Sequence, residues 1–332
     1  MINFAIVGAG AIAKLMATTI KMMNKGGDES VKLYAIASRS LEKAKEFAKE
    51  FGIEKAYGSY EELYNDPAIN LVYIATPHNF HYEQTKACLE HGKHVLCEKA
   101  FTVNAKEAKE LIDLSKEKKL LLAEAIWTRY QPMRQIINDV ISSGIVGQAF
   151  MITANLGYSI ADKPRLVKKD LAGGALLDVG VYPINFTNMI FGDPTGVEAT
   201  CIKNQEGVDV SNSITLTYAD TGRMAVLCSS ALCVSDRFGM IHCKDGFIQV
   251  ENINNPQSIQ VFNKQYQLIK EIKCPKQYTG YEYEVVACVK AIEAGLCECE
   301  QMPHERTLYI MNLLDSIRAQ LGIKYPFEKL NK

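Results

Sequence analysis

The sequence predicts an α/β protein: a doubly wound parallel sheet at the N-terminus, then an α+β domain with a large mixed, mostly antiparallel sheet. Over about the first 120 residues, short apolar runs alternate with segments of helical spacing. That pattern is typical of βα units around a buried parallel sheet. Beyond about residue 145, short strand-like runs separated by turn residues predominate, which indicates a sheet built from hairpins.

The first part is expected to alternate strand and helix. The predicted strands are 3–7, 32–37, 71–75, 94–97 and 120–124. The predicted helices are 11–24, 41–51, 81–91 and 104–118. Asn104 is expected to cap the last of these helices, because an asparagine side chain accepts a hydrogen bond from an N–H of the first turn.

The second part has strand signals at 149–156, 197–203, 213–218, 224–229, 239–242, 247–251, 258–262 and 267–272. Its predicted helices are 178–190, 281–294 and 305–321. We therefore predict a dinucleotide-binding domain at 1–123 and a substrate-binding domain at 124–332. The pattern leaves open whether the last helices pack back on the first domain.

The composition excludes several classes of protein. With 48% hydrophobic and 23% charged residues, the chain is expected to be globular. A net charge of −1 gives no field that would attract nucleic acid or an anionic membrane. No apolar run is long enough to span a bilayer and no basic leader precedes the first strand, so we expect a cytoplasmic protein. The ten cysteines show no zinc-site spacing and are expected to be reduced thiols, with no metal bound.

The turn after the first strand carries a phosphate-binding pattern. Gly8-Ala9-Gly10-Ala11-Ile12-Ala13 has the form G-x-G-x-x-A and opens a helix. Gly8 permits a tight turn, Gly10 lets the backbone approach a pyrophosphate, and Ala13 allows close packing of helix and sheet. The N–H groups at the helix start then face the phosphates. This predicts a Rossmann dinucleotide site; the alternative is a tight turn without a ligand.

The end of the second strand bears on the choice of cofactor. Ser38 and Arg39 stand where an NAD-preferring site usually has an acidic residue for the ribose 2′-hydroxyl. A hydroxyl and a guanidinium instead suit a 2′-phosphate. NADP(H) is therefore predicted as the preferred cofactor, with NAD(H) still possible because Arg39 can also lie against the adenine. The alternative is a solvated arginine at a strand end.

Two further strand ends carry polar residues. Thr76 and Pro77 follow the strand 71–75, at the edge where open α/β sheets bind ligands, and are expected to flank the ribose and nicotinamide. His81 begins the next helix and is predicted to contact substrate, whereas His78 is expected to be structural. Glu98-Lys99 ends the strand 94–97. The two residues form either a solvated ion pair, or a pair in which the Lys99 cation lies near the nicotinamide.

A third cluster lies in the second part. A glycine pair at 173–174 precedes a predicted helix in which Asp178 and Tyr182 are four residues apart and share one face. With a lysine nearby, an aspartate and a tyrosine form a plausible acid/base set, because a cation favours the phenolate. The alternative is that Asp178 caps the helix and Tyr182 packs in the core.

Over nearly its whole length the chain resembles the glucose–fructose oxidoreductase / inositol dehydrogenase / MocA family. The resemblance rests on the G-x-G-x-x-A turn, Glu98-Lys99 and the glycine–aspartate–helix segment. Segments 124–130 and 173–182 are most similar to the branch of dimeric dihydrodiol dehydrogenases and NADP-dependent D-xylose dehydrogenases. Unlike many relatives, which have histidine, the chain has tyrosine at position 182.

The resemblance implies hydride transfer between nicotinamide C4 and a carbon of a sugar, polyol or trans-dihydrodiol. Lys99 and Tyr182 would transfer the proton, with Asp178 in support. His81 and Trp127 would border the substrate together with Tyr182, and Tyr281 or Tyr283 is a further candidate. It also implies a homodimer through the second sheet.

The chain departs from the family pattern at Ala100, which stands in place of the family's proline. The direction of the Lys99 side chain is therefore less certain. Two other functions stay open at this point. One is an NADP-binding regulator without turnover, and the other is an aldose–aldose oxidoreductase with tightly held NADP.

Overall fold

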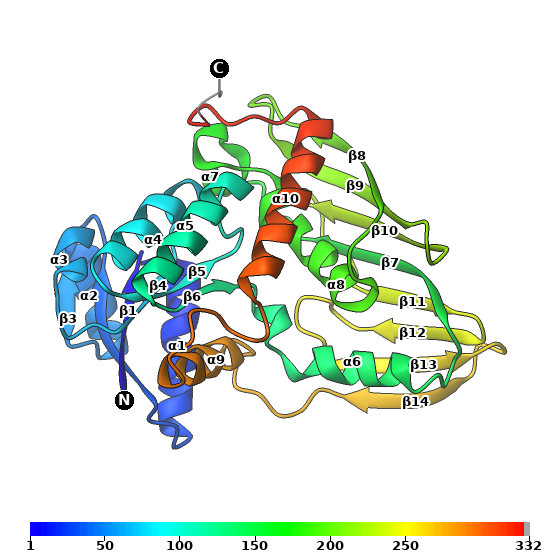
Figure 1. Cartoon of the computed structure of the whole chain (residues 1–332), viewed down its shortest axis with the longest axis horizontal. Helices are drawn as coiled ribbons and strands as arrows, with labels where there is room; N and C mark the ends of the chain where they lie inside the picture. The colour runs from blue at the N-terminus through cyan, green and yellow to red at the C-terminus, as the bar shows by residue number, and fades with distance from the viewer. Residues whose placement is uncertain (329–332) are drawn as a thin grey trace. The chain divides into compact units, whose positions relative to one another are not determined.

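The computed structural model describes residues 1–328, which divide into two compact units (Figure 1). The first unit consists of Met1–Tyr130 and Gln277–Met311, and the second of Gln131–Lys276 and the segment from Asn312 onward. An α/β unit with a parallel sheet and a unit with a large mixed sheet are both present, so the predicted fold class is confirmed.

The first unit is built on a parallel sheet. Its strands are β1 (Ile2–Val7), β2 (Val31–Ala37), β3 (Lys55–Tyr57), β4 (Leu71–Ile74), β5 (His94–Glu98) and β6 (Leu122–Ala125). They lie in the order β3-β2-β1-β4-β5-β6, and every adjacent pair is parallel. This order is that of the Rossmann fold, in which the carboxyl ends of all strands meet at one edge.

Helices connect these strands. They are α1 (Ala11–Lys25), α2 (Leu41–Phe51), α3 (Tyr60–Tyr64), α4 (His81–Glu90) and α5 (Ala105–Lys118), with short 3₁₀ turns η1 (His78–Phe80) and η2 (Trp127–Arg129). As predicted, the Asn104 side chain caps α5 by accepting a hydrogen bond from the Glu107 N–H at 3.0 Å. The sequence did not predict β3 or α3, because elements of three and five residues are too short to show a period.

The chain returns to this unit with α9 (Glu282–Glu293), which packs against α1. The Thr19 and Thr279 hydroxyls are 2.7 Å apart, and the Leu122 N–H donates to the Cys297 carbonyl at 2.9 Å. Helix α10 (His304–Leu321) contributes residues 304–311 to the first unit and 312–321 to the second. The units therefore divide at residues 130, 276 and 311, whereas the sequence suggested one division after 123.

The second unit is built on an eight-stranded sheet of order β14-β13-β12-β11-β7-β10-β9-β8. Its strands are β7 (Ala149–Gly157), β8 (Gly196–Lys203), β9 (Asp209–Tyr218), β10 (Arg223–Ser230), β11 (Gly239–Cys243), β12 (Gly246–Val250), β13 (Ser258–Asn263) and β14 (Leu268–Lys273). Within the described sheet only β7 and β10 pair in parallel. Each predicted strand corresponds to one of these, which confirms the mixed, mostly antiparallel sheet.

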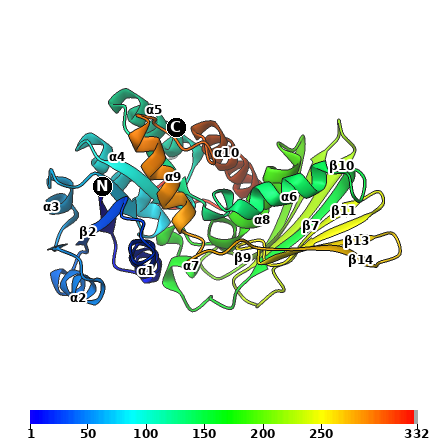
Figure 2. The ribbon, with the colours of Figure 1, turned by 90° about the horizontal axis from the view of Figure 1, so that it is seen from below.

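One face of this sheet is covered and the other is not. The helices of the unit include α6 (Pro132–Ser142), α7 (Pro164–Val167) and α8 (Val181–Phe191), with the short turns η3 (Lys169–Leu171) and η4 (Leu176–Gly180). Figure 2 shows α6 and α8 on the same side of the sheet, and α8 contacts β7 and β10. Buried Ile241 and Ile248 alternate with partly exposed His242 and Phe247, as expected for a sheet with one covered face. The predicted helix 178–190 begins as a π-helical turn, η4, before α8.

Among residues 1–328, none of the helices combines the length and apolar character that crossing a membrane requires.

Candidate active site

The glycine turn of the first unit has the geometry that its sequence predicts. Gly8 has φ +100°, and its N–H donates to the Ala37 carbonyl at 2.9 Å. A Cβ on Gly8 would lie 2.8 Å from the Ala75 carbonyl oxygen, so a larger residue does not fit. Gly10 precedes α1 without a side-chain cap, and a Cβ there would meet no atom within 4 Å. The open space above the first N–H groups of α1, whose first turn holds no acidic residue, suits a pyrophosphate.

The end of β2 supplies the predicted 2′-phosphate residues. Ser38 is buried, and its hydroxyl accepts a weak hydrogen bond from the Ser40 N–H at 3.4 Å. Arg39 is exposed, with its guanidinium carbon 5.8 Å from the centroid of the Phe80 ring. This is within cation–π range, so Phe80 holds the planar guanidinium at the carboxyl edge of the sheet. This role of Phe80 was not predicted, because the residue lies 41 positions away from Arg39 in the chain.

His81 joins two strand ends. Its ring is fully buried, with Nδ1 2.9 Å from the Ala100 carbonyl and Nε2 2.8 Å from the Thr76 carbonyl. Burial lowers the pKa of His81, and these two carbonyls oppose that shift. Because both ring nitrogens face backbone oxygens, the imidazole holds the segment after β4 against the segment after β5. The Thr76 hydroxyl, in turn, donates to Gln84 at 2.6 Å.

Lys99 follows the end of β5 and is half-buried. Its backbone N–H donates to Glu98 Oε2 at 3.2 Å, and the Lys99–Ala100 peptide bond is cis. The buried Glu98 carboxylate also accepts a hydrogen bond from the Tyr73 hydroxyl. Glu98 is therefore tied into the protein interior rather than forming a solvated pair with its neighbour, and the Lys99 backbone is fixed at the carboxyl edge.

Two more carboxyl groups are buried near Glu98. Burial raises the pKa of Glu124 to about 7, while Thr307 and Arg129 oppose this shift. Burial, reinforced by the charge of Glu98, also raises the pKa of Glu284 well above its usual range. Neither Glu284 oxygen has a hydrogen-bond partner. A buried carboxyl without a hydrogen-bond partner avoids the cost of desolvation by taking up a proton, so burial favours the protonated form of Glu284.

Trp127 and Tyr281 form an aromatic pair in the first unit. Their rings stack with centroids 4.1 Å apart and an interplanar angle of 12°. Tyr281 is held by the residue that follows it, because the Glu282 carboxylate accepts hydrogen bonds from the N–H groups of Tyr278, Thr279 and Gly280. Of the two tyrosines considered as further candidates to border the substrate, Tyr281 is the one that stacks on Trp127.

Asp178 and Tyr182 lie at the start of a buried helix in the second unit. Asp178 is the third residue of η4 and does not cap it, and its carboxylate accepts a hydrogen bond from Arg165 Nη2 at 3.2 Å. Tyr182 is buried in the first turn of α8. The sequence analysis did not predict a role for Arg165, which lies 13 residues before Asp178. Lys99 belongs to the first unit, whereas Asp178 and Tyr182 belong to the second.

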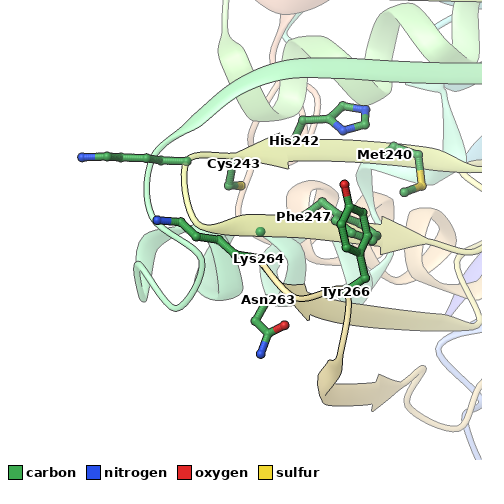
Figure 3. Close-up of a pocket in the computed structure, with 9 residues that line it drawn as sticks. Met240, His242, Cys243, Phe247, Asn263, Lys264 and Tyr266 are labelled. Carbon is green, nitrogen blue, oxygen red and sulfur yellow. The ribbon is translucent and has the colours of Figure 1, made fainter.

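The uncovered sheet face of the second unit has a hollow of about 500 Å³. Figure 3 shows Phe247, Tyr266 and His242 around it. Phe247 stacks on Phe262, and Lys264 forms an ion pair with Asp245 at 2.6 Å. None of the predicted catalytic, cofactor or substrate residues lines this hollow.

All ten cysteines are free thiols. Within residues 1–328, no three His, Cys, Asp or Glu side chains are grouped so that they could hold a metal ion.

Two family models match the chain. Residues 2–125 match the oxidoreductase family with an NAD-binding Rossmann fold, and residues 134–249 match the GFO/IDH/MocA C-terminal domain. Similar curated proteins include the trans-1,2-dihydrobenzene-1,2-diol dehydrogenase of Xenopus tropicalis, 36% identical over 88% of this chain and 90% of the relative. The Homo sapiens protein of the same name is 31% identical over 99% of both chains.

Solved structures share the fold at lower identity. A 3-ketoreductase from Actinomadura kijaniata, KijD10, in complex with NADP and TDP-benzene, has a TM-score of 0.85 at 24% identity over 96% of this chain and 98% of its own. A levoglucosan dehydrogenase in complex with NADH has a TM-score of 0.84 at 20% identity over 97% of both chains.

The raised pKa of Glu124 predicts a pH-dependent stability. Between pH 4.5 and about 7 the folded protein keeps a proton that the unfolded chain loses, so stability falls as pH rises through this interval. The difference amounts to about 3 kcal/mol, at about 1.4 kcal/mol for each pH unit. In urea unfolding, the free energy of unfolding of Glu124→Gln should decrease by about 3 kcal/mol less than that of the wild type between pH 4.5 and 8, because glutamine is neutral at every pH. The exposed Glu83→Gln serves as the control; an unchanged decline in Glu124→Gln would contradict the assignment.

Proposed function

Because the chain belongs to the GFO/IDH/MocA oxidoreductase family, we propose that it transfers hydride between NADP(H) and a carbinol carbon of a trans-dihydrodiol, sugar or polyol. Like its relatives, the chain is an NAD(P)-dependent oxidoreductase that acts on CH–OH groups. The dihydrodiol relatives, which match 88–99% of the chain, support the proposed substrate class.

The residues of the first unit fit a dinucleotide. Gly10, where a Cβ would meet no atom within 4 Å, leaves room for a pyrophosphate, and α1 begins without a capping side chain. No acidic side chain follows β2 directly, and Arg39 is exposed there. These features favour a cofactor with a 2′-phosphate.

The observation that carries the proposal is the position of Lys99. Its backbone is fixed to Glu98 at the end of β5, the same edge of the sheet at which the glycine turn lies. A Rossmann sheet binds its dinucleotide at this edge. A lysine cation there can stabilise the negative charge that develops on a substrate oxygen.

Tyr182 is proposed as the proton acceptor and donor. In oxidation, a nicotinamide cofactor held at the glycine turn would supply the acceptor for the hydride of the carbinol carbon. The hydroxyl proton of the same carbon passes to the Tyr182 phenolate oxygen, and the Lys99 ammonium stabilises the alkoxide character of the substrate. Asp178, paired with Arg165, supports the turn from which Tyr182 projects. In reduction, each transfer runs in reverse.

Tyr182→Phe and Lys99→Met test this assignment. Each should lower kcat by about 10²–10⁴-fold, because general acid/base groups contribute on that scale. NADPH affinity should stay nearly unchanged. The assay follows NADPH absorbance with NADP⁺ and trans-1,2-dihydrobenzene-1,2-diol, then with sugars and cyclic polyols. Tyr218→Phe, a buried tyrosine whose hydroxyl donates to the Gly192 carbonyl, is the control. Near-normal turnover in both site variants would refute the assignment; no turnover by the wild type with any substrate, despite NADPH binding, would favour a regulator.

Arg39→Ala tests the cofactor preference. Loss of a charge-assisted contact to the 2′-phosphate should weaken NADPH binding by about tenfold or more, and NADH binding much less. Fluorescence titration of both cofactors measures this, with Lys49→Ala at the far end of α2 as a matched loss of positive charge. Equal losses for the two cofactors would mean that Arg39 acts on the adenine, which they share.

We also propose a homodimer through the uncovered sheet face. Val226 of β10 lies on this face between Thr153 and Thr215. Light scattering should give twice the chain mass of 37.0 kDa for the wild type and a shift toward the monomer for Val226→Glu, because a charge is costly in an apolar interface. Lys290→Glu on α9 is the control. A wild-type monomer at every concentration would rule out the dimer.

A further inference from the structure

The turn that carries Asp178 is buried yet lacks a cap of its own. All five residues of η4 are buried, and the residue before it, Ala175, supplies no side-chain hydrogen bond. The first N–H groups of a helix have no partner within the helix, and a buried N–H without a partner costs free energy. A partner must therefore come from another part of the fold.

Asp209, at the start of β9, supplies that partner. Its Oδ2 accepts a hydrogen bond from the Leu176 N–H at 2.7 Å and another from Asn212 Nδ2 at 2.8 Å. Asn212 in turn accepts from the Ser229 hydroxyl at 2.7 Å. A buried polar chain thus runs from β10 through β9 to the first residue of η4.

The glycines of the turn fit closely around this chain. A Cβ on Gly174, which has φ +137°, would lie 2.4 Å from Asp209 Oδ1. A Cβ on Gly180 would lie 3.0 Å from the Ser229 hydroxyl oxygen. On the other side, the Tyr325 hydroxyl donates to the Gly173 carbonyl at 2.9 Å. The segment is therefore closely packed at Gly174 and Gly180, and it is hydrogen-bonded at the Gly173 carbonyl and at the Leu176 N–H.

Burying Asp209 is costly. The residue is 1% exposed, and burial raises the pKa of its carboxyl even though it accepts several hydrogen bonds. Its Oδ1 has no hydrogen-bond partner. A position that served only to fill space would be occupied more favourably by an apolar side chain. The carboxylate instead meets the positive end of the η4–α8 segment, where an anion is stabilised.

We propose that Asp209 is a positioning residue for the reaction, which sets the place of Asp178 and Tyr182 by anchoring the Leu176 N–H to the sheet. The inference rests on the proposed function of these two residues. A strand of an eight-stranded sheet is a rigid anchor, and a displacement of about 1 Å in a reacting group can reduce turnover by about 10²-fold. The residue acts through η4 and need not touch the substrate.

Two variants separate positioning from simple stabilisation. Asp209→Ala removes the acceptor and should lower kcat with trans-1,2-dihydrobenzene-1,2-diol by about tenfold or more, with KM for NADP⁺ unchanged, because the glycine turn belongs to the first unit. Asp209→Asn keeps an oxygen acceptor for Leu176 and should restore most of kcat. Ser213→Ala, on the opposite face of β9, is the control. If Asp209→Ala lowers thermal stability while kcat is unchanged, Asp209 is a structural cap and the proposal is overturned.

A double-mutant cycle tests whether Asp209 acts through Tyr182. In a Tyr182→Phe background, Asp209→Ala should cost little further turnover, whereas independent effects would multiply. If Asp209→Ala folds poorly, Asn212→Ala, which removes the amide that orients the carboxylate, gives the same comparison. Multiplying losses would overturn the proposal.

Hydrogen exchange separates failure of this inference from failure of the proposed function. Amides of residues 174–182 should exchange faster in Asp209→Ala than in Asp209→Asn or the wild type, while the amides of the eight-stranded sheet keep their protection. Unchanged exchange in this segment would overturn the anchoring role whatever the activity data show. Near-normal turnover in Tyr182→Phe would instead refute the proposed function, and the exchange result would still decide whether Asp209 fixes the turn.

Discussion

The first unit depends on the close approach of the β1 turn to the ends of its two neighbouring strands. Gly8 donates to Ala37 at the end of β2, and its α-carbon lies against the carbonyl of Ala75 after β4. Only glycine permits both contacts at φ +100°. The start of α1 is thereby placed at the carboxyl edge of the sheet, with its N–H groups directed at the space where phosphates bind.

The same edge is supported from inside by buried polar groups. His81 holds the segments after β4 and β5 together through two carbonyls, and Glu98 fixes the backbone of Lys99. Glu124 and Glu284 increase the density of carboxyl groups behind this edge, and burial raises the pKa of both. Burial favours the protonated form of both acids, and a protonated neighbour does not repel the Glu98 carboxylate. The position of Lys99 is thus a property of the interior, not of a surface loop.

Features set by local sequence were predictable. Strand alternation gave all eight strands of the second sheet, and the glycine spacing placed the turn at Gly8. Features set by distant parts of the chain were not. The return of 277–311 to the first unit depends on contacts such as that between Leu122 and Cys297. Helix α6 was not predicted. It begins at Pro132, shortly after the polar and aromatic segment 124–130, which the sequence analysis considered only as part of the site.

The same distinction between local and distant features applies to the site. A strand-end position singled out Lys99, and a spacing of four residues on a predicted helix singled out Asp178 and Tyr182. Their supports could not be found in this way. Arg165 reaches Asp178 across 13 residues, and Asp209 reaches Leu176 across 33. A single sequence contains no signal for such pairs, since neither periodicity nor a local motif links them.

The proposed cofactor residues of the first unit and the proposed acid/base residues of the second unit are held by opposite means. In the first unit, the main-chain geometry at Gly8 suits a large cofactor, whose many contacts tolerate small displacements. In the second unit, one tyrosine must meet one hydroxyl, and a proton moves efficiently only over a short hydrogen bond. Greater rigidity is therefore needed at α8 than at the glycine turn. A buried carboxylate on a central sheet, bonded directly to the first N–H of the turn, provides it at a cost in stability that the surrounding apolar core offsets.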